Sequence, residues 1–177
     1  MAKTEVLLIS PDFIRATTNI SNNLQDKYLH SAIREATDID FEEIIGGKML
    51  TNIKNLVASG DINKEENIKY KDLLSAAKYF LAYSAISRIV VISSAKIDNA
   101  GLSQNTDEHI ESLDIKEVFQ LEKYYTNKAD AYKKRLQNYI LRNNNIYPDL
   151  CSDCFETPVN LNSAASTGIF LGGARGK

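Results

Sequence analysis

The spacing of apolar residues in the first half of the chain predicts two helices joined by a tight turn. From Asp26, which is a good N-cap residue, apolar positions recur every three or four residues and so share one helix face. Gly46 and Gly47 are expected to end this helix in a left-handed cap. A second apolar helix follows and stops at residues 59–61, so the pair is predicted to form an antiparallel hairpin. The apolar positions are Leu29, Ala32, Ile33, Ala36, Ile39, Phe41, Ile44 and Ile45, then Met49, Leu50, Ile53, Leu56 and Val57.

The second half of the chain predicts two longer helices. The third helix is expected to be capped by Asn63 and to reach Ala95, and from Ala76 it is apolar nearly all round, which is typical of a central helix. Residues 98–101 end it, and residues 102–109 are polar and predict a loop or a short exposed hairpin. The fourth helix runs from about residue 114 to 142 and closes at residues 147–148. Its predicted buried stripe is Val118, Leu121, Tyr125, Ala129, Tyr132, Leu136, Tyr139 and Ile140.

The two ends of the chain carry weaker patterns. Residues 4–9 predict a short strand or an extended arm, and Ser10, Pro11 and Asp12 start a short helix. Residues 149–177 are rich in Ser, Asn, Ala and Gly, which is typical either of a disordered tail or of an arm that docks on a partner. We therefore predict an all-α bundle of about four main helices. Its divisions are an N-terminal arm with a short helix (1–25), a helical core (26–148) and a C-terminal docking arm (149–177).

Composition narrows the class of protein. The chain has 177 residues with 44% hydrophobic composition, enough for one domain with a real core. Lys and Arg total 21 and Asp and Glu total 23, so the surface as a whole does not have the positive charge of a nucleic-acid-binding protein. The first residues do not resemble a signal peptide, and the apolar stretch 79–92, interrupted by Arg88, is short for a membrane span of about 20 residues. We expect a buried core helix, no membrane, and synthesis in a reducing cytoplasm.

Candidate catalytic and metal-binding chemistry is sparse. Cys151 and Cys154 have the CxxC spacing of half a zinc site or a redox pair, but no second pair accompanies them. The two histidines, His30 and His109, have no evident nucleophile partner. The acidic run Asp38, Asp40, Glu42 and Glu43 would suit a divalent cation, although a solvated helix face is the default interpretation. Gly46, Gly47 and Lys48 do not complete a phosphate loop. We expect no enzyme, no cofactor and no metal.

Charge is distributed unevenly around the fourth helix. Acidic residues precede it and basic residues follow within it, which would allow copies of the chain to pair head to tail. The same basic helix would also suit phosphate binding, and a soluble face is the third alternative. The acidic residues are Asp107, Glu108, Glu111, Asp114 and Glu117, and the basic ones are Lys123, Lys128, Lys133, Lys134, Arg135 and Arg142. The predicted interface residues are Ile169, Phe170 and Leu171 of the tail, with Lys133, Lys134, Arg135, Asp107 and Glu108.

The order of these segments resembles a known family. The first matching part is residues 19–29, followed by Ala32–Ile33, Glu35–Ala36, residues 44–46 and Met49–Leu50. This succession is similar to the opening helix pair of head–tail connector (adaptor) proteins of tailed bacteriophages. Residues 128–140, followed by 143–149, resemble the closing helix and Tyr-Pro stop of connectors from phages that infect gut Bacteroidales, including the crAss-like group. The resemblance covers roughly residues 4–150 and rests on segment order. Cys151, Cys154 and the long tail depart from it.

The resemblance implies a structural protein of the virion rather than an enzyme. Family members are small helical bundles that repeat as a homo-oligomeric ring, typically twelve-fold, at the junction of capsid and tail. The ring lies under the portal protein, extends the channel through which genomic DNA passes without specific binding, and receives a tail protein or a second ring. The alternative that follows from the residues is a small helical DNA-binding protein that uses the basic last helix.

Overall fold

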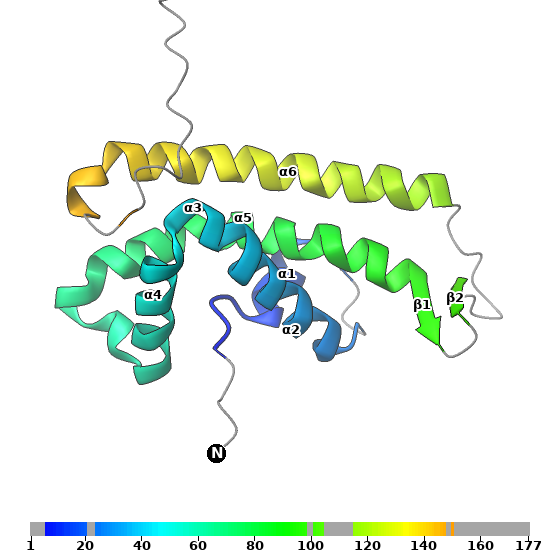
Figure 1. The fold of residues 1–177 in the computed structure, drawn as a ribbon, viewed down its shortest axis with the longest axis horizontal. Coiled ribbons are helices and arrows are strands. Elements are labelled where there is room, and N and C mark those ends of the chain that lie inside the picture. The colour runs from blue at the N-terminus through cyan, green and yellow to red at the C-terminus, as the bar shows by residue number, and fades with distance from the viewer. Residues whose placement is uncertain (1–5, 21–23, 99–100, 105–114, 148–149, 151–177) are drawn as a thin grey trace, which may run out of the picture.

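The fold is all-α, as predicted, with one very short β-hairpin (Figure 1). The computed structural model describes residues 6–20, 24–98, 101–104, 115–147 and 150. Six α-helices lie in this part of the chain: α1 (Pro11–Thr17), α2 (Asp26–Glu35), α3 (Glu42–Ile45), α4 (Gly47–Ser59), α5 (Ile68–Ser94) and α6 (Ile115–Arg142). A π-helical segment, Ala36–Phe41, joins α2 to α3, and 3₁₀ turns occupy Asp61–Asn63, Glu65–Asn67 and Asn144–Ile146.

The long helices α5 and α6 form an antiparallel pair on which the rest of the fold is built (Figure 1). Helix α5 also packs against α1, α2 and the π-helical segment, so the prediction of a central helix is confirmed. By length and composition alone, Glu65–Ile92 would be able to cross a membrane, but half of that window is buried inside the protein, as in the core helix of many folds. Its buried side chains are Tyr70, Leu73, Ala77, Phe80, Leu81, Ala82, Ser84, Ala85, Ile86 and Ile89.

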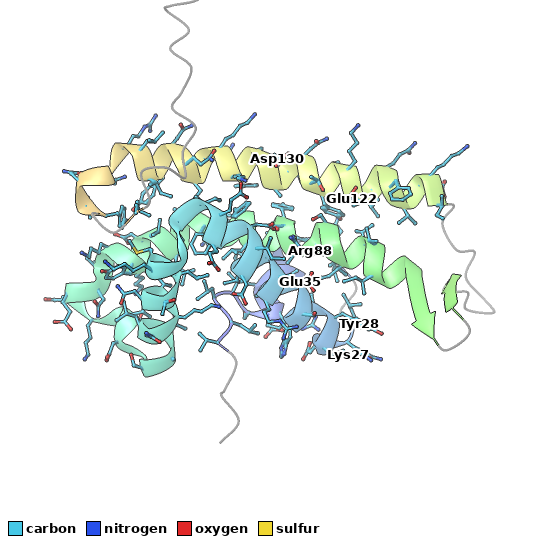
Figure 2. All side chains as sticks on the ribbon, viewed as in Figure 1. Lys27, Tyr28, Glu35, Arg88, Glu122 and Asp130 are labelled. Carbon is cyan, nitrogen blue, oxygen red and sulfur yellow. The ribbon has the colours of Figure 1, made fainter. Side chains whose placement is uncertain are left out.

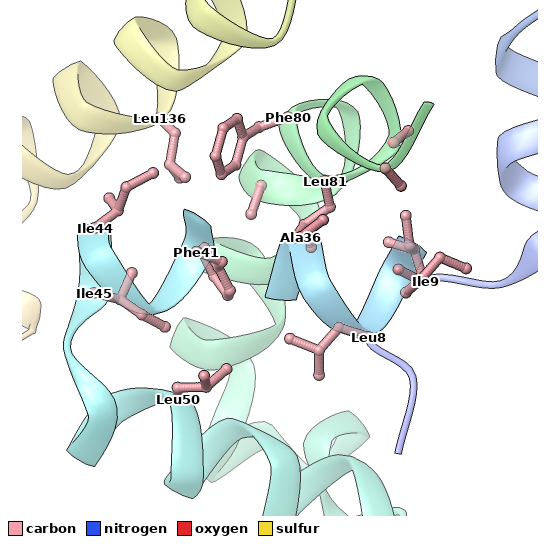
Figure 3. Packing of buried hydrophobic residues seen from close by; sticks show 14 of the residues in the cluster. Leu8, Ile9, Ala36, Phe41, Ile44, Ile45, Leu50, Phe80, Leu81 and Leu136 are labelled. Carbon is pink, nitrogen blue, oxygen red and sulfur yellow. The ribbon is translucent and has the colours of Figure 1, made fainter. Parts of the chain in front are cut away.

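The strands β1 (Ala95–Asp98) and β2 (Gly101–Gln104) form an antiparallel hairpin at the end of α5. Helix α5 therefore ends at Ser94, one residue before the end of the predicted apolar stretch and ahead of the predicted stop at residues 98–101, and the polar segment that follows begins as a hairpin. On the other side of α5, Ser10 caps α1 by accepting a hydrogen bond from the Phe13 amide at 3.1 Å. Leu8 and Ile9 of the arm before α1 are buried against the core, and residues 6–10 form no strand (Figure 3).

The predicted N-caps of two helices are wrong for local reasons. Gln25 is the N-cap of α2, and Asp26 is its first helical residue, where its carboxylate accepts a hydrogen bond from the Arg15 guanidinium instead of capping. That ion pair holds the pKa of Asp26 below its usual value. Asn63 closes a 3₁₀ turn, and a second 3₁₀ turn intervenes before α5 begins at Ile68.

The two helices of the predicted hairpin are present, but the turn between them differs from the prediction. Gly46 has φ 77° and ψ 151°, so its φ is positive as expected of a glycine stop, but its ψ is extended rather than left-handed helical. Gly46 is both the C-cap of α3 and the N-cap of α4, and α4 contacts α3 (Figure 1). Gly60, with φ 77° and ψ 0°, provides the true left-handed cap at the end of α4.

One hydrophobic core connects these elements. Phe41, Ile44 and Ile45 of the π-helical segment and α3 pack towards Phe80 of α5 and Leu136 of α6, with Leu50 of α4 below them (Figure 3). The predicted stripe of α6 is buried or half-buried except at Leu121, which is 37% exposed.

Tyr147 fastens the end of α6 to the start of α5. Its ring is buried, and its hydroxyl donates a hydrogen bond to the Lys69 carbonyl at 3.0 Å and lies 3.2 Å from the Tyr139 hydroxyl. Burial and the contact with Tyr139 raise the pKa of Tyr147. The predicted closure at Tyr147 is therefore a specific contact between the two long helices.

Candidate functional site

A groove of about 540 Å³ lies between α5, α6 and the end of α2. Its apolar lining consists of Phe80, Val91 and Ile92 of α5 and Ala129 of α6. Its charged lining comes from all three walls: Glu35 of α2 and Asp40 of the π-helical segment, Arg88 of α5, and Glu122, Asp130 and Lys133 of α6. Figure 2 labels Glu35, Arg88, Glu122 and Asp130. Four carboxylates and two cations give this lining a formal charge of −2.

An ion-pair cluster around Arg88 forms the floor of the groove. Its guanidinium contacts both carboxylate oxygens of Asp40, with Nη1–Oδ2 at 2.7 Å and Nη2–Oδ1 at 2.9 Å, and its Nε lies 3.5 Å from Glu35 Oε2. Nη1 also donates to Ser84 Oγ at 2.9 Å, and the Ser84 hydroxyl donates to Asp40. Asp40 is positioned by the π-helical segment, a feature that is frequent at functional sites.

The α6 wall of the groove is acidic. Glu122 accepts a hydrogen bond from the Thr126 hydroxyl at 2.8 Å, and Asp130 lies two turns further along (Figure 2). Lys133 is held by Glu43 of α3, with its Nζ 3.0 Å from Glu43 Oε2. In the part of the chain that the structure describes, no cation pairs with Glu122 or Asp130. These two carboxylates therefore leave negative charge on this wall.

Six aromatic rings form a continuous row, which we call the aromatic ladder. In the order of their contacts, the rings are Phe13 of α1, Tyr79 of α5, Tyr132 of α6, Tyr83 of α5, and Tyr125 and Tyr124 of α6. The tightest stack is Tyr83 on Tyr132, with ring centroids 5.3 Å apart and planes inclined by 13°. Such contacts stabilise beyond the apolar area they bury.

Three cations lie over rings of the aromatic ladder. The ammonium of Lys128 lies 4.4 Å from the centroid of Tyr124 and 5.1 Å from that of Tyr83. Arg135 lies 5.1 Å from the centroid of Tyr132, and Lys78 lies over Phe13 and Tyr79. Hydrogen bonding to Tyr124 raises the pKa of Lys128. The ladder is therefore a basic aromatic edge, because these cation–π contacts fix positive charge on its rings.

The start of α6 exposes large apolar side chains. Ile115 is 65% exposed, Phe119 59% and Tyr124 51%. Val91 and Ile92, at the end of α5 that lies beside this part of α6, are also exposed. Ile115 and Phe119 lie one turn apart on one side of α6, whereas Leu121 and Tyr124 lie on the opposite side. We call Ile115 and Phe119 the apolar row of α6.

Comparison with known proteins identifies a family but no characterised relative. A family model described as "Family of unknown function (DUF6712)" matches residues 40–157, which is two thirds of the chain. The chain belongs to this family. A search of curated proteins and a search of solved structures each returned no match.

The DUF6712 region contains the elements that form most of the surfaces described above. It begins at Asp40 and includes α3, α4, the whole α5–α6 pair and Tyr147. Of the groove's charged lining only Glu35 lies outside it, and of the aromatic ladder only Phe13. The groove and the ladder are thus built mainly by this region.

The three consecutive basic residues that were predicted at an interface have different surroundings in the structure. Lys133 is engaged by Glu43, Lys134 is exposed on the outer side of α6, and Arg135 lies on Tyr132. The predicted partners Asp107 and Glu108, the tail residues Ile169, Phe170 and Leu171, and the cysteines Cys151 and Cys154 lie outside the described residues. Glu122 and Asp130 were missed by sequence reasoning, although their eight-residue spacing, close to two helical turns, places them on one side of α6.

The acidic run is a set of ion pairs rather than a simple solvated face. Asp38 pairs with Lys54, Asp40 with Arg88 and Glu43 with Lys133. Within the described ranges, no three His, Cys, Asp or Glu side chains are placed to hold a metal ion. The run therefore connects the π-helical segment and α3 to α4, α5 and α6.

Proposed function

We propose that this protein is a structural subunit of a virion, a head–tail connector that forms a homo-oligomeric ring between the capsid and the tail of a bacteriophage. In this role the ring lies below the portal protein, extends the DNA channel and presents its other face to a tail protein or a second ring. The resemblance in segment order supports the proposal, and the all-α fold is compatible with it.

The observation that carries the proposal is the apolar row of α6. Ile115 and Phe119 are each more than half exposed and lie one turn apart on the same side of α6. Exposed apolar patches of this kind mark association surfaces, because covering them removes apolar area from water. In a ring each subunit makes the same contact twice, so contacts of modest individual strength sum to a stable assembly.

The channel imposes a second requirement. DNA must pass without being held, so the residues that line the lumen should be polar and not strongly basic, because each phosphate contact adds affinity. We therefore expect the basic residues of α6 to face away from the lumen.

The test is the assembly state of the full-length protein. We expect sedimentation velocity and negative-stain microscopy to show rings, and a variant with Ile115→Ser and Phe119→Ser to remain folded but to lose them. Gln120→Ser, at an exposed polar position of the same helix, is the matched control and should assemble normally. The protein should also cofractionate with portal protein in purified particles. A protein that stays monomeric and is absent from virions would overturn the proposal.

The second candidate is a small DNA-binding protein. It is favoured by the exposed cations of α6, namely Lys123, Lys134 and Arg142, which lie along one helix. Phosphate binding by this helix predicts affinity for duplex DNA that falls steeply as salt rises. Rings that form without measurable DNA affinity would eliminate this candidate.

A further inference from the structure

We propose that the two sides of the α5–α6 pair are the two halves of a single head-to-tail contact, in which the basic aromatic ladder of one copy docks on the acidic groove of the next. The inference rests on the proposed ring and names the surfaces that would close it. The occupant of the groove is thus a second copy of this chain.

The groove and the ladder lie on different sides of the seam between the two helices. On α6 the groove is lined by positions 122, 126, 129, 130 and 133, and the ladder side carries Tyr125 and Tyr132 with the cations Lys128 and Arg135. The centres of the two sets are about 120° apart around the helix. The same offset separates Phe80, Ser84 and Arg88 from Tyr79 and Tyr83 on α5.

Two different surfaces on one chain make a heterologous contact. When the groove of one copy receives the ladder of the next, each copy keeps one free groove and one free ladder, so the contact repeats until a ring closes. A two-fold dimer would instead place the groove and the ladder of one copy on the ladder and the groove of the same partner, which uses up both surfaces at once. A ring forms when the groove and the ladder of each copy meet two different copies, as the proposed function requires, and the number of subunits seen in sedimentation distinguishes the two arrangements.

The charges of the two surfaces are opposite. The groove lining has a formal charge of −2, and on its α6 wall Glu122 and Asp130 have no cation partner within the described part of the chain. Lys128 and Arg135 lie on aromatic rings, and no carboxylate among the described residues pairs with them. Complementary potentials of this kind guide and orient association between proteins.

The spacing of the charges also matches. Glu122 and Asp130 are eight residues apart on α6, or about 12 Å along the helix, and Lys128 and Arg135 are seven apart, or about 10.5 Å. Neighbouring copies whose α6 helices run side by side can therefore form two ion pairs at once. Around these pairs, the apolar lining of the groove would contact the tyrosine rings of the next copy. This composition is typical of an interface, because aromatic residues and Arg are enriched in interface cores.

A charge-swap experiment on the full-length protein tests the contact. In variant A, Lys128→Glu and Arg135→Glu make both surfaces acidic; in variant B, Glu122→Lys and Asp130→Lys make both basic. Sedimentation velocity should show each variant alone as a folded monomer, with association weakened about 100-fold or more. Mixed in equal amounts, A and B should assemble again in strict alternation, because each ladder then meets a groove of opposite charge.

The matched control carries the same change of net charge on another face. Lys123→Glu with Lys134→Glu alters two exposed cations on the outer side of α6 and should assemble as the wild type does. If the wild type forms rings and A and B each assemble normally, the contact between ladder and groove is refuted but the proposed ring is not. The same holds if the wild type forms rings and a mixture of A and B fails to assemble. A wild type that never assembles would overturn both the ring and this contact.

Discussion

Arg88 of α5 and Asp40 of the π-helical segment form a two-point ion pair between residues that are 48 positions apart in the chain. Both nitrogen–oxygen distances are below 3 Å, and each side chain is 24% exposed. This geometry fixes the π-helical segment against α5 and at the same time sets the floor of the groove.

Asp40→Asn should therefore destabilise the protein. The amide cannot reproduce the two charge-assisted bonds, and the half-buried guanidinium loses its main partner, so we expect a loss of about 1–3 kcal/mol in the free energy of unfolding, measured by urea denaturation. Asp38→Asn is the matched control. Its pair with Lys54 is more exposed, at 40% and 31%, and should contribute less than about 1 kcal/mol. Equal losses in the two variants would contradict the role given to Arg88.

A second prediction concerns the hydroxyl of Tyr147. Tyr147→Phe keeps the buried ring but removes the hydrogen bond to the Lys69 carbonyl, so we expect a loss of about 1 kcal/mol. Tyr28→Phe, at a residue whose ring is more than a third exposed, is the control and should change little.

The same hydroxyl predicts a dependence on pH. Because folding raises the pKa of Tyr147, its contribution to stability is fully present below the ordinary tyrosine pKa of about 10 and is lost as the pH rises further. The wild type should therefore lose stability in this alkaline range faster than Tyr147→Phe does. Parallel pH profiles for the two proteins would contradict the burial of this group.

The helices were predictable because they depend on local pattern. The apolar periodicity of α6 located that helix to within a residue at both ends, and Pro11 after Ser10 located the start of α1. The nearly unbroken apolar sequence located the body of α5, although the helix begins five residues after the predicted cap Asn63 and ends before residues 98–101. The directions between helices were not predictable in the same way. Gly46 was recognised as a stop, but its extended ψ, which sets the direction in which α4 leaves α3, has no signal in the sequence.

The groove was harder to predict for a different reason. Asp40 and Arg88 are distant in sequence, and their meeting depends on a π-helical segment whose extra residue per turn no periodicity argument signals. The ladder likewise joins tyrosines from two helices whose register the sequence leaves open. Both surfaces are long-range consequences of how α5 packs on α6.

Another prediction concerns Gly60. With φ 77° it occupies the left-handed region, and nothing lies within 4 Å of the place a Cβ would take, so Gly60→Ala adds backbone strain without a clash. We expect a loss of about 1–2 kcal/mol in thermal or urea unfolding. Gly47→Ala is the contrast. It lies in the first turn of α4, where an added Cβ would meet only the flexible end of Glu42, and it should be neutral or slightly stabilising.

The last prediction concerns the centre of the aromatic ladder. Tyr83 stacks on Tyr132 and Tyr125 and carries Lys128 over its ring. Tyr83→Leu keeps an apolar side chain but removes these ring contacts, so we expect a loss of about 1–2 kcal/mol and a reduced near-ultraviolet circular dichroism signal.

The same change should also weaken assembly, because Lys128 loses one of the two rings that orient it. Tyr28→Leu is the control, since its ring is partly exposed and carries only the neighbouring Lys27. If Tyr83→Leu has the same free energy of unfolding and the same assembly as the wild type, the ring contacts of the ladder neither stabilise the fold nor orient the cations. A loss of assembly at temperatures where the variant remains folded would instead connect ring stacking directly to the contact between copies.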